Sequence, residues 1–108
     1  MRRWWAVVLL ALAAASAEHV FELTLDHGKL RADLDPIRVH QGDTVVLRWH
    51  TDRTVMLHLH GYDIETRASP GTTAETRFEA RAAGRYPIDV HGAGGGEAVL
   101  LYLEVYPD

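Results

Sequence analysis

The sequence predicts an all-β domain, a small β-sandwich of about seven strands. From Glu18 onward, apolar and polar residues alternate in short runs, and helical spacing of apolar residues is nearly absent. Glycine, proline or aspartate, the residues that favour turns, separate the runs. With 108 residues, the chain has room for one such domain and not for a second with its own core.

Seven segments have the alternation typical of strands. Trp49 shares one strand face with Val45 and Leu47, so we expect it to anchor the core. Asp35-Pro36 should bend the chain early in the domain, because proline disfavours a regular strand interior. In chain order the expected strands are 20–25, 30–39, 44–50, 55–60, 72–80, 86–90 and 98–106.

The first 17 residues have the features of a secretory signal peptide. Two arginines precede an apolar run, 4–15, that leads into Ala15-Ser16-Ala17. This run is shorter than the roughly 20 residues that a membrane-spanning helix needs. We therefore expect cleavage after Ala17, with 18–108 as the mature domain in the periplasm or outside the cell. The alternative is an uncleaved segment that anchors the domain to the membrane.

Composition excludes several classes of function. The formal net charge is −4, which argues against nucleic acid as a partner, and no phosphate-binding glycine loop or P-loop lysine points to a nucleotide. Without cysteine, the chain has no disulfide, no catalytic thiol and no thiolate ligand for copper. Ser69, the one serine after the leader, lies before Pro70 in a turn. We therefore expect no catalytic residues and no enzyme.

Three segments carry a resemblance to the cupredoxin-like domain family. They are 37–49, with its Gly-Asp turn and Trp49, then His60-Gly61-Tyr62-Asp63-Ile64, and then 84–90. They resemble small exported cupredoxin-like proteins with a His-x-His-Gly-Tyr segment and, more distantly, the copper domains of nitrous-oxide reductase and oxidase subunit II. The resemblance implies a Greek-key β-sandwich. Val90 stands where the family has its ligand cysteine, and no methionine follows it, so the usual copper site is missing.

Three histidines could still form a metal site of another kind. His58 and His60 are two residues apart and share one strand face, which lets both rings approach one ion. His91 is the candidate third ligand. Strict alternation points it away from Ile88 and Val90, and a bulge or the start of the loop at Gly92 could re-aim it.

Imidazoles without a thiolate suit Cu(II), Zn(II) or Ni(II). We therefore predict a non-blue histidine site, with copper as the first candidate, that serves periplasmic metal handling. Asp63 is the preferred carboxylate to accept a proton from a bound imidazole and fix its orientation, and Asp89 is the second choice. Met56 shares the histidine face but is more simply explained as a packing residue.

Two alternatives remain open. The domain could be a metal-free interaction or assembly module that kept the fold and lost the site, and it would then bind an envelope protein partner. Its docking surfaces would be the terminal strand, 99–105, or the mobile glycine loop, 92–96. An enzyme that uses a histidine-bound metal to activate water or oxygen would need an open coordination position and a pocket.

Overall fold

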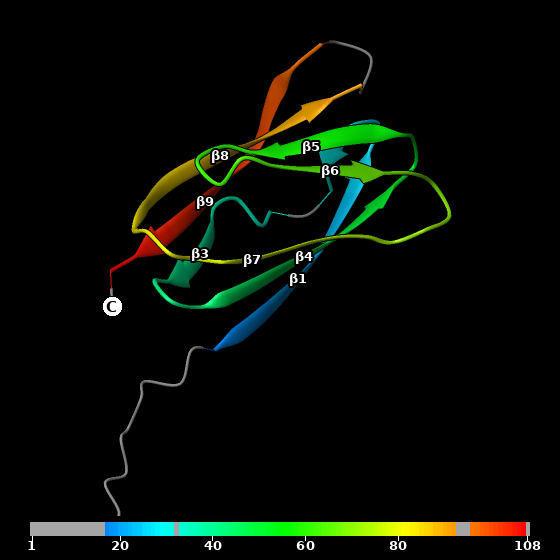
Figure 1. Ribbon diagram of the computed structural model, residues 1–108. Helices are drawn as coiled ribbons and strands as arrows, with labels where there is room; N and C mark the ends of the chain where they lie inside the picture. The colour runs from blue at the N-terminus through cyan, green and yellow to red at the C-terminus, as the bar shows by residue number, and fades with distance from the viewer. Residues whose placement is uncertain (1–16, 32, 93–95, 108) are drawn as a thin grey trace, which may run out of the picture.

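The computed structural model describes residues 17–31, 33–92 and 96–107, and these residues form nine β-strands in two packed sheets (Figure 1). The described residues contain no helix, and therefore none that is long and apolar enough to cross a membrane. The predicted leader, apart from Ala17, lies outside the described residues, as does the middle of the predicted glycine loop, 93–95. The predicted all-β sandwich is confirmed.

Four strands form one sheet, in the spatial order β2-β1-β4-β7. β1 runs parallel to β4, whereas β1 with β2 and β4 with β7 are antiparallel pairs. The bounds of these strands are β1 (Glu18–Asp26), β2 (Lys29–Leu30), β4 (Thr44–Thr51) and β7 (Ala74–Glu79).

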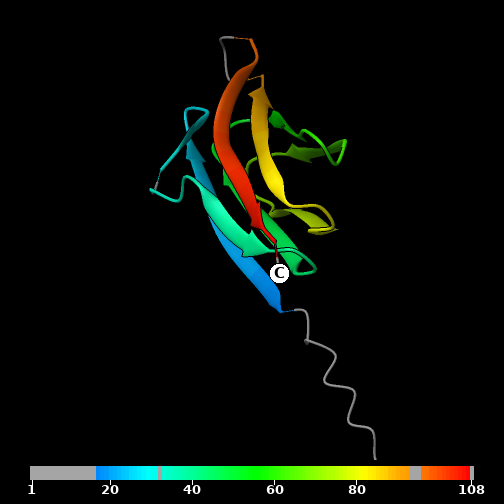
Figure 2. The same ribbon diagram turned by 90° about the vertical axis from the view of Figure 1, so that its left-hand side faces the viewer.

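The other five strands form the second sheet, in the order β3-β9-β8-β5-β6. β3 runs parallel to β9, as the side view in Figure 2 shows, and the remaining pairs are antiparallel. The middle of this sheet therefore consists of β9, β8 and β5. The bounds are β3 (Ile37–His40), β5 (Val55–Leu59), β6 (Ile64–Ala68), β8 (Gly84–His91) and β9 (Ala98–Tyr106).

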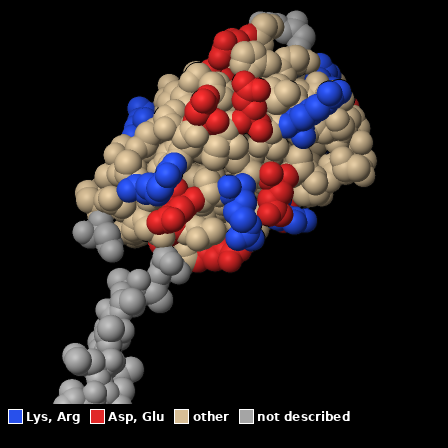
Figure 3. Space-filling model, viewed as in Figure 1, with Lys and Arg blue, Asp and Glu red and all other residues tan. Residues whose placement is uncertain are grey.

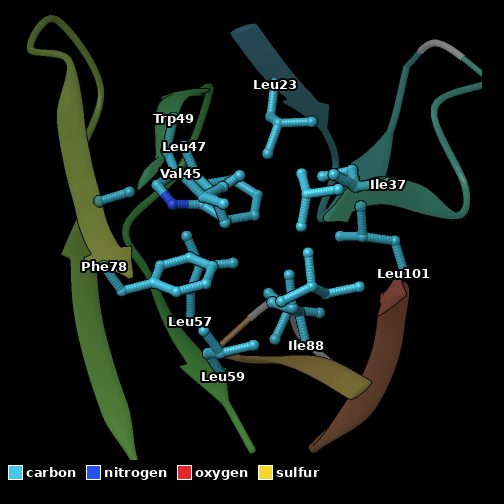
Figure 4. Close-up of a cluster of buried hydrophobic side chains, with 14 of the residues drawn as sticks. Leu23, Ile37, Val45, Leu47, Trp49, Leu57, Leu59, Phe78, Ile88 and Leu101 are labelled. Atoms are coloured by element: carbon cyan, nitrogen blue, oxygen red, sulfur yellow. The ribbon is translucent and has the colours of Figure 1, made fainter. Parts of the chain in front are cut away.

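The hydrophobic core lies between the two sheets (Figure 4). Trp49 is 1% exposed, which confirms it as a core residue, and its indole nitrogen donates to the hydroxyl of Thr76 at 3.0 Å. Val45 and Leu47 lie on the same inward face of β4. From the opposite sheet, alternate residues of β5 and β8 fill the other side of the core, because successive side chains of a strand point to opposite faces.

The structure has nine strands where the sequence pattern predicted about seven. The predicted strand 30–39 is two strands, because β2 ends at Leu30 and β3 begins only after Asp35-Pro36. The pattern also missed β6, in which Ile64 is the one large apolar residue. β6 pairs with β5 over its whole length, so the hydrogen bonds of the neighbouring strand, rather than its own side chains, define it.

An aromatic cluster fixes the turn that follows β5. The rings of Tyr62 and Tyr86 have their centroids 5.0 Å apart, and the Tyr62 ring lies 5.1 Å from that of Phe78. The hydroxyl of Tyr86 donates to the carbonyl of Ala82 at 2.8 Å. Gly61 has a φ of 87°, and a Cβ at this position would lie 2.4 Å from Cδ1 of Tyr86. Only glycine therefore allows this close approach, which sets where the chain leaves β5.

Candidate metal centre

The three predicted histidines lie on one face, the outer face of the five-stranded sheet. Leu57 and Leu59 of β5 point into the core, so His58 points outward, and His60 follows on the same side. On β8, Ile88 and Val90 are buried, so Asp89 and His91 point outward as well. His91 lies opposite Met56, which places it on the histidine face, and the pairing of β8 with β9 has a register shift between Ile88 and Asp89.

The register between β5 and β8 brings these outward side chains opposite one another. Met56 pairs with His91, and His58 pairs with Asp89. The backbone N–H of His60 donates to the carbonyl of Pro87 at 3.0 Å, which extends the pairing one residue beyond β5. Residues about thirty positions apart in the sequence therefore meet on adjacent strands, within reach of each other's side chains.

Three side chains converge most closely, those of His60, Asp89 and Glu97. Nε2 of His60 lies 2.6 Å from Oδ2 of Asp89 and 3.9 Å from Oε1 of Glu97. One nitrogen or oxygen atom from each of the three lies within 4.8 Å of the others. The three come from the residue after β5, from β8 and from the residue before β9. They are the arrangement in the described chain that best matches a metal site, and we call them the metal centre.

The other two predicted ligands border the metal centre without belonging to the group of three. The ring of His58 has its centroid 4.2 Å from that of His60. On the other side, Nε2 of His91 lies 3.2 Å from the same Glu97 oxygen that His60 approaches. Five residues that could bind a metal are therefore contiguous on this face, two of them carboxylates.

Asp89 is the buried member of the metal centre. Its side chain is 10% exposed, and its second oxygen, Oδ1, is buried with no hydrogen-bond partner among the described residues. Burial raises the pKa of the Asp89 carboxyl, but the hydrogen bond with His60 and the charges of His60 and His91 outweigh burial. The pKa therefore lies below its ordinary value of 3.8. The group is a carboxylate at neutral pH, in which Oδ2 contacts His60 and Oδ1 has no hydrogen-bond partner among the described residues.

Asp63, the carboxylate that the sequence favoured for orienting an imidazole, lies outside the metal centre. Its Oδ1 is 3.3 Å from Nε2 of His58, and its side chain is 97% exposed. Asp89 makes the shorter and more buried contact, to His60. Asp63 can act only on His58, which is itself beside the metal centre rather than in it.

Sequence reasoning did not find Glu97. It lies between the glycine loop and β9, and nothing in its local pattern marks it as a ligand. The pairing of β8 with β9, in which Val90 lies opposite Ala98, carries Glu97 to the level of His91. The available signal was its position: an isolated carboxylate directly before a strand that neighbours the histidine strand.

A second group of metal-binding residue types, Asp26, His27 and Asp52, lies where the β1–β2 turn meets the β4–β5 turn. All three residues are exposed, and Asp52 already accepts the backbone N–H of His27 with both carboxylate oxygens at 3.1 Å. Such exposed groups are common on protein surfaces, and we assign no site to it. On the face shown in Figure 3, basic and acidic side chains are interspersed and neither sign forms a continuous patch.

The terminal strand does not offer a free edge along its whole length, which was one of the two docking modes, with an exposed apolar patch, that the interaction-module hypothesis proposed. β9 lies between β3 and β8, and β3 pairs with it from Leu103 to Tyr106. Edge pairing along the whole of 99–105 is therefore excluded. The second proposed docking surface, the glycine loop, has its centre outside the described residues.

Comparison with known proteins identifies the fold. The sequence matches no protein-family model and no curated protein sequence. The structure is similar to a chain of a heme-copper terminal oxidase dimer, with a TM-score of 0.69 and 18% identity, over 87% of this chain and 67% of that one.

Two further solved copper proteins are similar. One is a Cu-containing nitrite reductase from Thermus scotoductus SA-01, with a TM-score of 0.63 and 23% identity over 85% of this chain and 28% of that one. The other is a blue copper oxidase from Nitrosomonas europaea, with a TM-score of 0.56 and 18% identity over 69% and 32%. The chain spans about a third of each. The chain thus has a cupredoxin-like fold, as the sequence resemblance implied.

Proposed function

We propose that this protein is an exported, cupredoxin-like metal-binding protein that carries Cu(II) at His60, Asp89 and Glu97. The observation that carries the proposal is the convergence of these three side chains, whose buried member, Asp89, also has an oxygen, Oδ1, without a hydrogen-bond partner among the described residues. A buried, unpaired carboxylate oxygen is costly, and a bound cation would remove that cost. Copper is cargo in this proposal, taken up and passed on.

The chemistry of the donors favours copper among divalent ions. An imidazole nitrogen and two carboxylate oxygens suit Cu(II), Ni(II) and Zn(II), and a site of this type binds Cu(II) most tightly of the three. The copper-containing neighbours in the structure comparison support the same choice. Because the chain has no cysteine, no thiolate can give a blue centre. The proposed site is therefore non-blue.

His58 and His91 have supporting roles in this proposal. His91 contacts Glu97 and can hold its carboxylate toward the ion, as outer hydrogen bonds commonly do for metal ligands. His58 packs against the ring of His60 and limits its rotation. Both imidazoles are also close enough to complete the coordination of Cu(II) after small side-chain movements. This role is binding rather than catalysis, so we propose no enzymatic activity.

A titration of the purified protein with Cu(II) tests the proposal. We expect one tightly bound equivalent, an electron paramagnetic resonance spectrum with nitrogen hyperfine structure, and no intense charge-transfer band from a thiolate. The variants His60→Ala and Asp89→Asn should lose this equivalent. His27→Ala is the matched control, because His27 is an exposed histidine beside carboxylates outside the metal centre.

Two results would contradict the proposal. One is the absence of specific Cu(II) uptake by the correctly folded protein, judged by its circular dichroism. The other is uptake that His60→Ala and Asp89→Asn leave unchanged. Either result would favour the alternative hypothesis, a metal-free interaction module.

A further inference from the structure

We infer that the metal centre holds copper only as Cu(II) and releases it when a one-electron reductant such as ascorbate converts it to Cu(I). This inference rests on the function proposed above. It concerns which oxidation state of copper the site binds and what causes the site to release the ion.

The first argument is the chemical softness of the ligands. Cu(I) prefers thiolate and thioether sulfur, whereas carboxylate oxygen is a hard donor that favours divalent ions. Two of the three converging side chains are carboxylates, Asp89 and Glu97. The chain has no cysteine and two methionines, of which Met56 is the one in the described part. The group of three therefore contains no soft sulfur ligand for Cu(I).

Met56 is poorly placed to supply that missing sulfur. On one side it pairs with His91, which lies outside the group of three. On its other side it pairs with Arg67, and both line a cavity of about 240 Å³ next to His91. The guanidinium charge of Arg67 disfavours a cation in that cavity. Met56 therefore does not turn the face into a Cu(I) site.

The second argument is charge. Asp89 and Glu97 together neutralise a divalent ion, but they leave one uncompensated negative charge beside a monovalent ion. Asp89 is nearly buried, and an unbalanced charge costs more there than in water. Reduction therefore weakens the attraction between ion and site and adds an unfavourable residual charge.

The third argument is that each carboxylate of the emptied site has one histidine contact. His60 contacts Asp89 at 2.6 Å, and His91 contacts Glu97 at 3.2 Å. Each carboxylate thus has a histidine to take the place of the departing ion. Release does not leave two adjacent carboxylates without partners, which lowers its free-energy cost.

The electron count of the release step is simple. The reductant gives one electron to copper, which passes from Cu(II) to Cu(I), and ascorbate becomes its one-electron oxidised radical. The ring nitrogen of His60 that copper leaves takes up a proton from water, so that it can donate to Asp89, and no other covalent bond of the protein forms or breaks. The bonds from copper to His60, Asp89 and Glu97 break, and the ion moves to an acceptor that offers softer ligands.

The test uses the full protein loaded with one equivalent of Cu(II) and the Cu(I) chelator bathocuproine disulfonate. With ascorbate, we expect complete transfer of copper to the chelator, and without ascorbate little transfer. Separate competition titrations should give a dissociation constant for Cu(I) at least about 100-fold weaker than that for Cu(II), as the hard donor set requires.

Two variants sharpen the test. Glu97→Met introduces a thioether into the metal centre and should narrow the gap between the two dissociation constants by strengthening Cu(I) binding. Met56→Leu is the control and should change neither constant.

Equal affinity of the natural protein for both oxidation states would overturn the inference while leaving the proposed function intact. Loss of Cu(I) affinity in Met56→Leu would also overturn it. Failure to bind Cu(II) at all would refute both.

Discussion

Asp89 is the residue on which the metal centre depends. It is the buried member of the group, it carries the unpartnered oxygen, and the position was read from the sequence only as a second choice for orienting a histidine. Its burial could not be read from the sequence, because alternation places it on an outer face. Asp89 is buried because it is surrounded by the side chains of His60, His91 and Glu97.

Replacing Asp89 by asparagine keeps the size of the side chain and removes its charge. We expect Cu(II) affinity to fall at least about tenfold, the loss that even outer partners of metal ligands produce. Competition titration against a chelator of known affinity measures this. Asp63→Asn is the comparison, because Asp63 is exposed and touches only His58. An equal loss in both variants would mean that overall negative charge, rather than this carboxylate, attracts the ion.

Asp43 gives a prediction about stability and pH that is independent of the metal. Its carboxylate accepts the backbone N–H of His40 at 2.9 Å and lies 3.1 Å from Nε2 of His19. The hydrogen bond from His40 lowers the pKa of Asp43; burial opposes this, and the charge of His19 adds to it, so the folded-state pKa lies below 3.8.

A lowered folded-state pKa stabilises the fold above the unfolded value, and this contribution is lost as the pH falls through the folded value. Urea unfolding should therefore show Asp43 stabilising the fold at pH 7 and losing this contribution progressively below about pH 4. Asp43→Asn should cost about 1 kcal/mol at pH 7, and this cost should shrink at low pH. A cost that is the same at both pH values would show that the charge of Asp43 plays no part.

At the scale of elements, the positions of the strands in the sequence were more predictable than their pairing and register. The alternation of apolar residues located β4, β5, β8 and β9, because each has one face in the core. It did not locate β6, whose partner strand defines it. The metal centre has the same limit: His60 was predicted from its strand, but Glu97 reaches it only through the registers of β5 with β8 and β8 with β9. Register depends on contacts between distant segments, so a local pattern does not contain it.

The turn after β5 should be sensitive to a single methyl group. Gly61→Ala places a Cβ 2.4 Å from the Tyr86 ring at a φ of 87°, so both clash and backbone strain oppose it. We expect a loss of about 3 kcal/mol in the free energy of unfolding, from strain and overpacking together. Cu(II) affinity should fall too, because His60 directly precedes this turn.

Gly71→Ala is the matched control for that turn. Gly71 has a φ of 84°, but a Cβ there meets nothing within 4 Å. Its cost should be the backbone strain alone, about 1 kcal/mol, with unchanged Cu(II) affinity. If the two variants were equally stable in urea unfolding, the contact between Gly61 and Tyr86 would have no role in the turn.

At the scale of the whole molecule, stability and metal binding should be separable. Trp49 fills the core from the four-stranded sheet, whereas the metal centre lies on the outer face of the other sheet. Trp49→Phe removes the indole hydrogen bond to Thr76 and leaves unfilled volume, which should cost about 2 kcal/mol. Cu(II) affinity should stay within about twofold, because distant sites act independently. A large loss of affinity would show that the core positions the centre directly.

The predicted leader also has a consequence at this scale. We expect the exported protein to begin at Glu18, which mass spectrometry of the secreted or periplasmic form would show. An intact N-terminus in a membrane fraction would instead support the anchored alternative. β1 begins at Glu18, so cleavage after Ala17 leaves every residue of that strand in place.

The proposed metal centre draws its three side chains from segments joined to three adjacent strands, in a chain that has no cysteine and therefore no disulfide. An ion held by His60, Asp89 and Glu97 closes the chain between positions 60 and 97 into a loop, as a covalent cross-link would. Unlike a disulfide, this cross-link opens when the ion leaves. The loaded protein should therefore resist heat and proteases better than the empty one, by an amount that grows with the free ion concentration. The half-life of the protein in its compartment would then depend on how much metal that compartment contains.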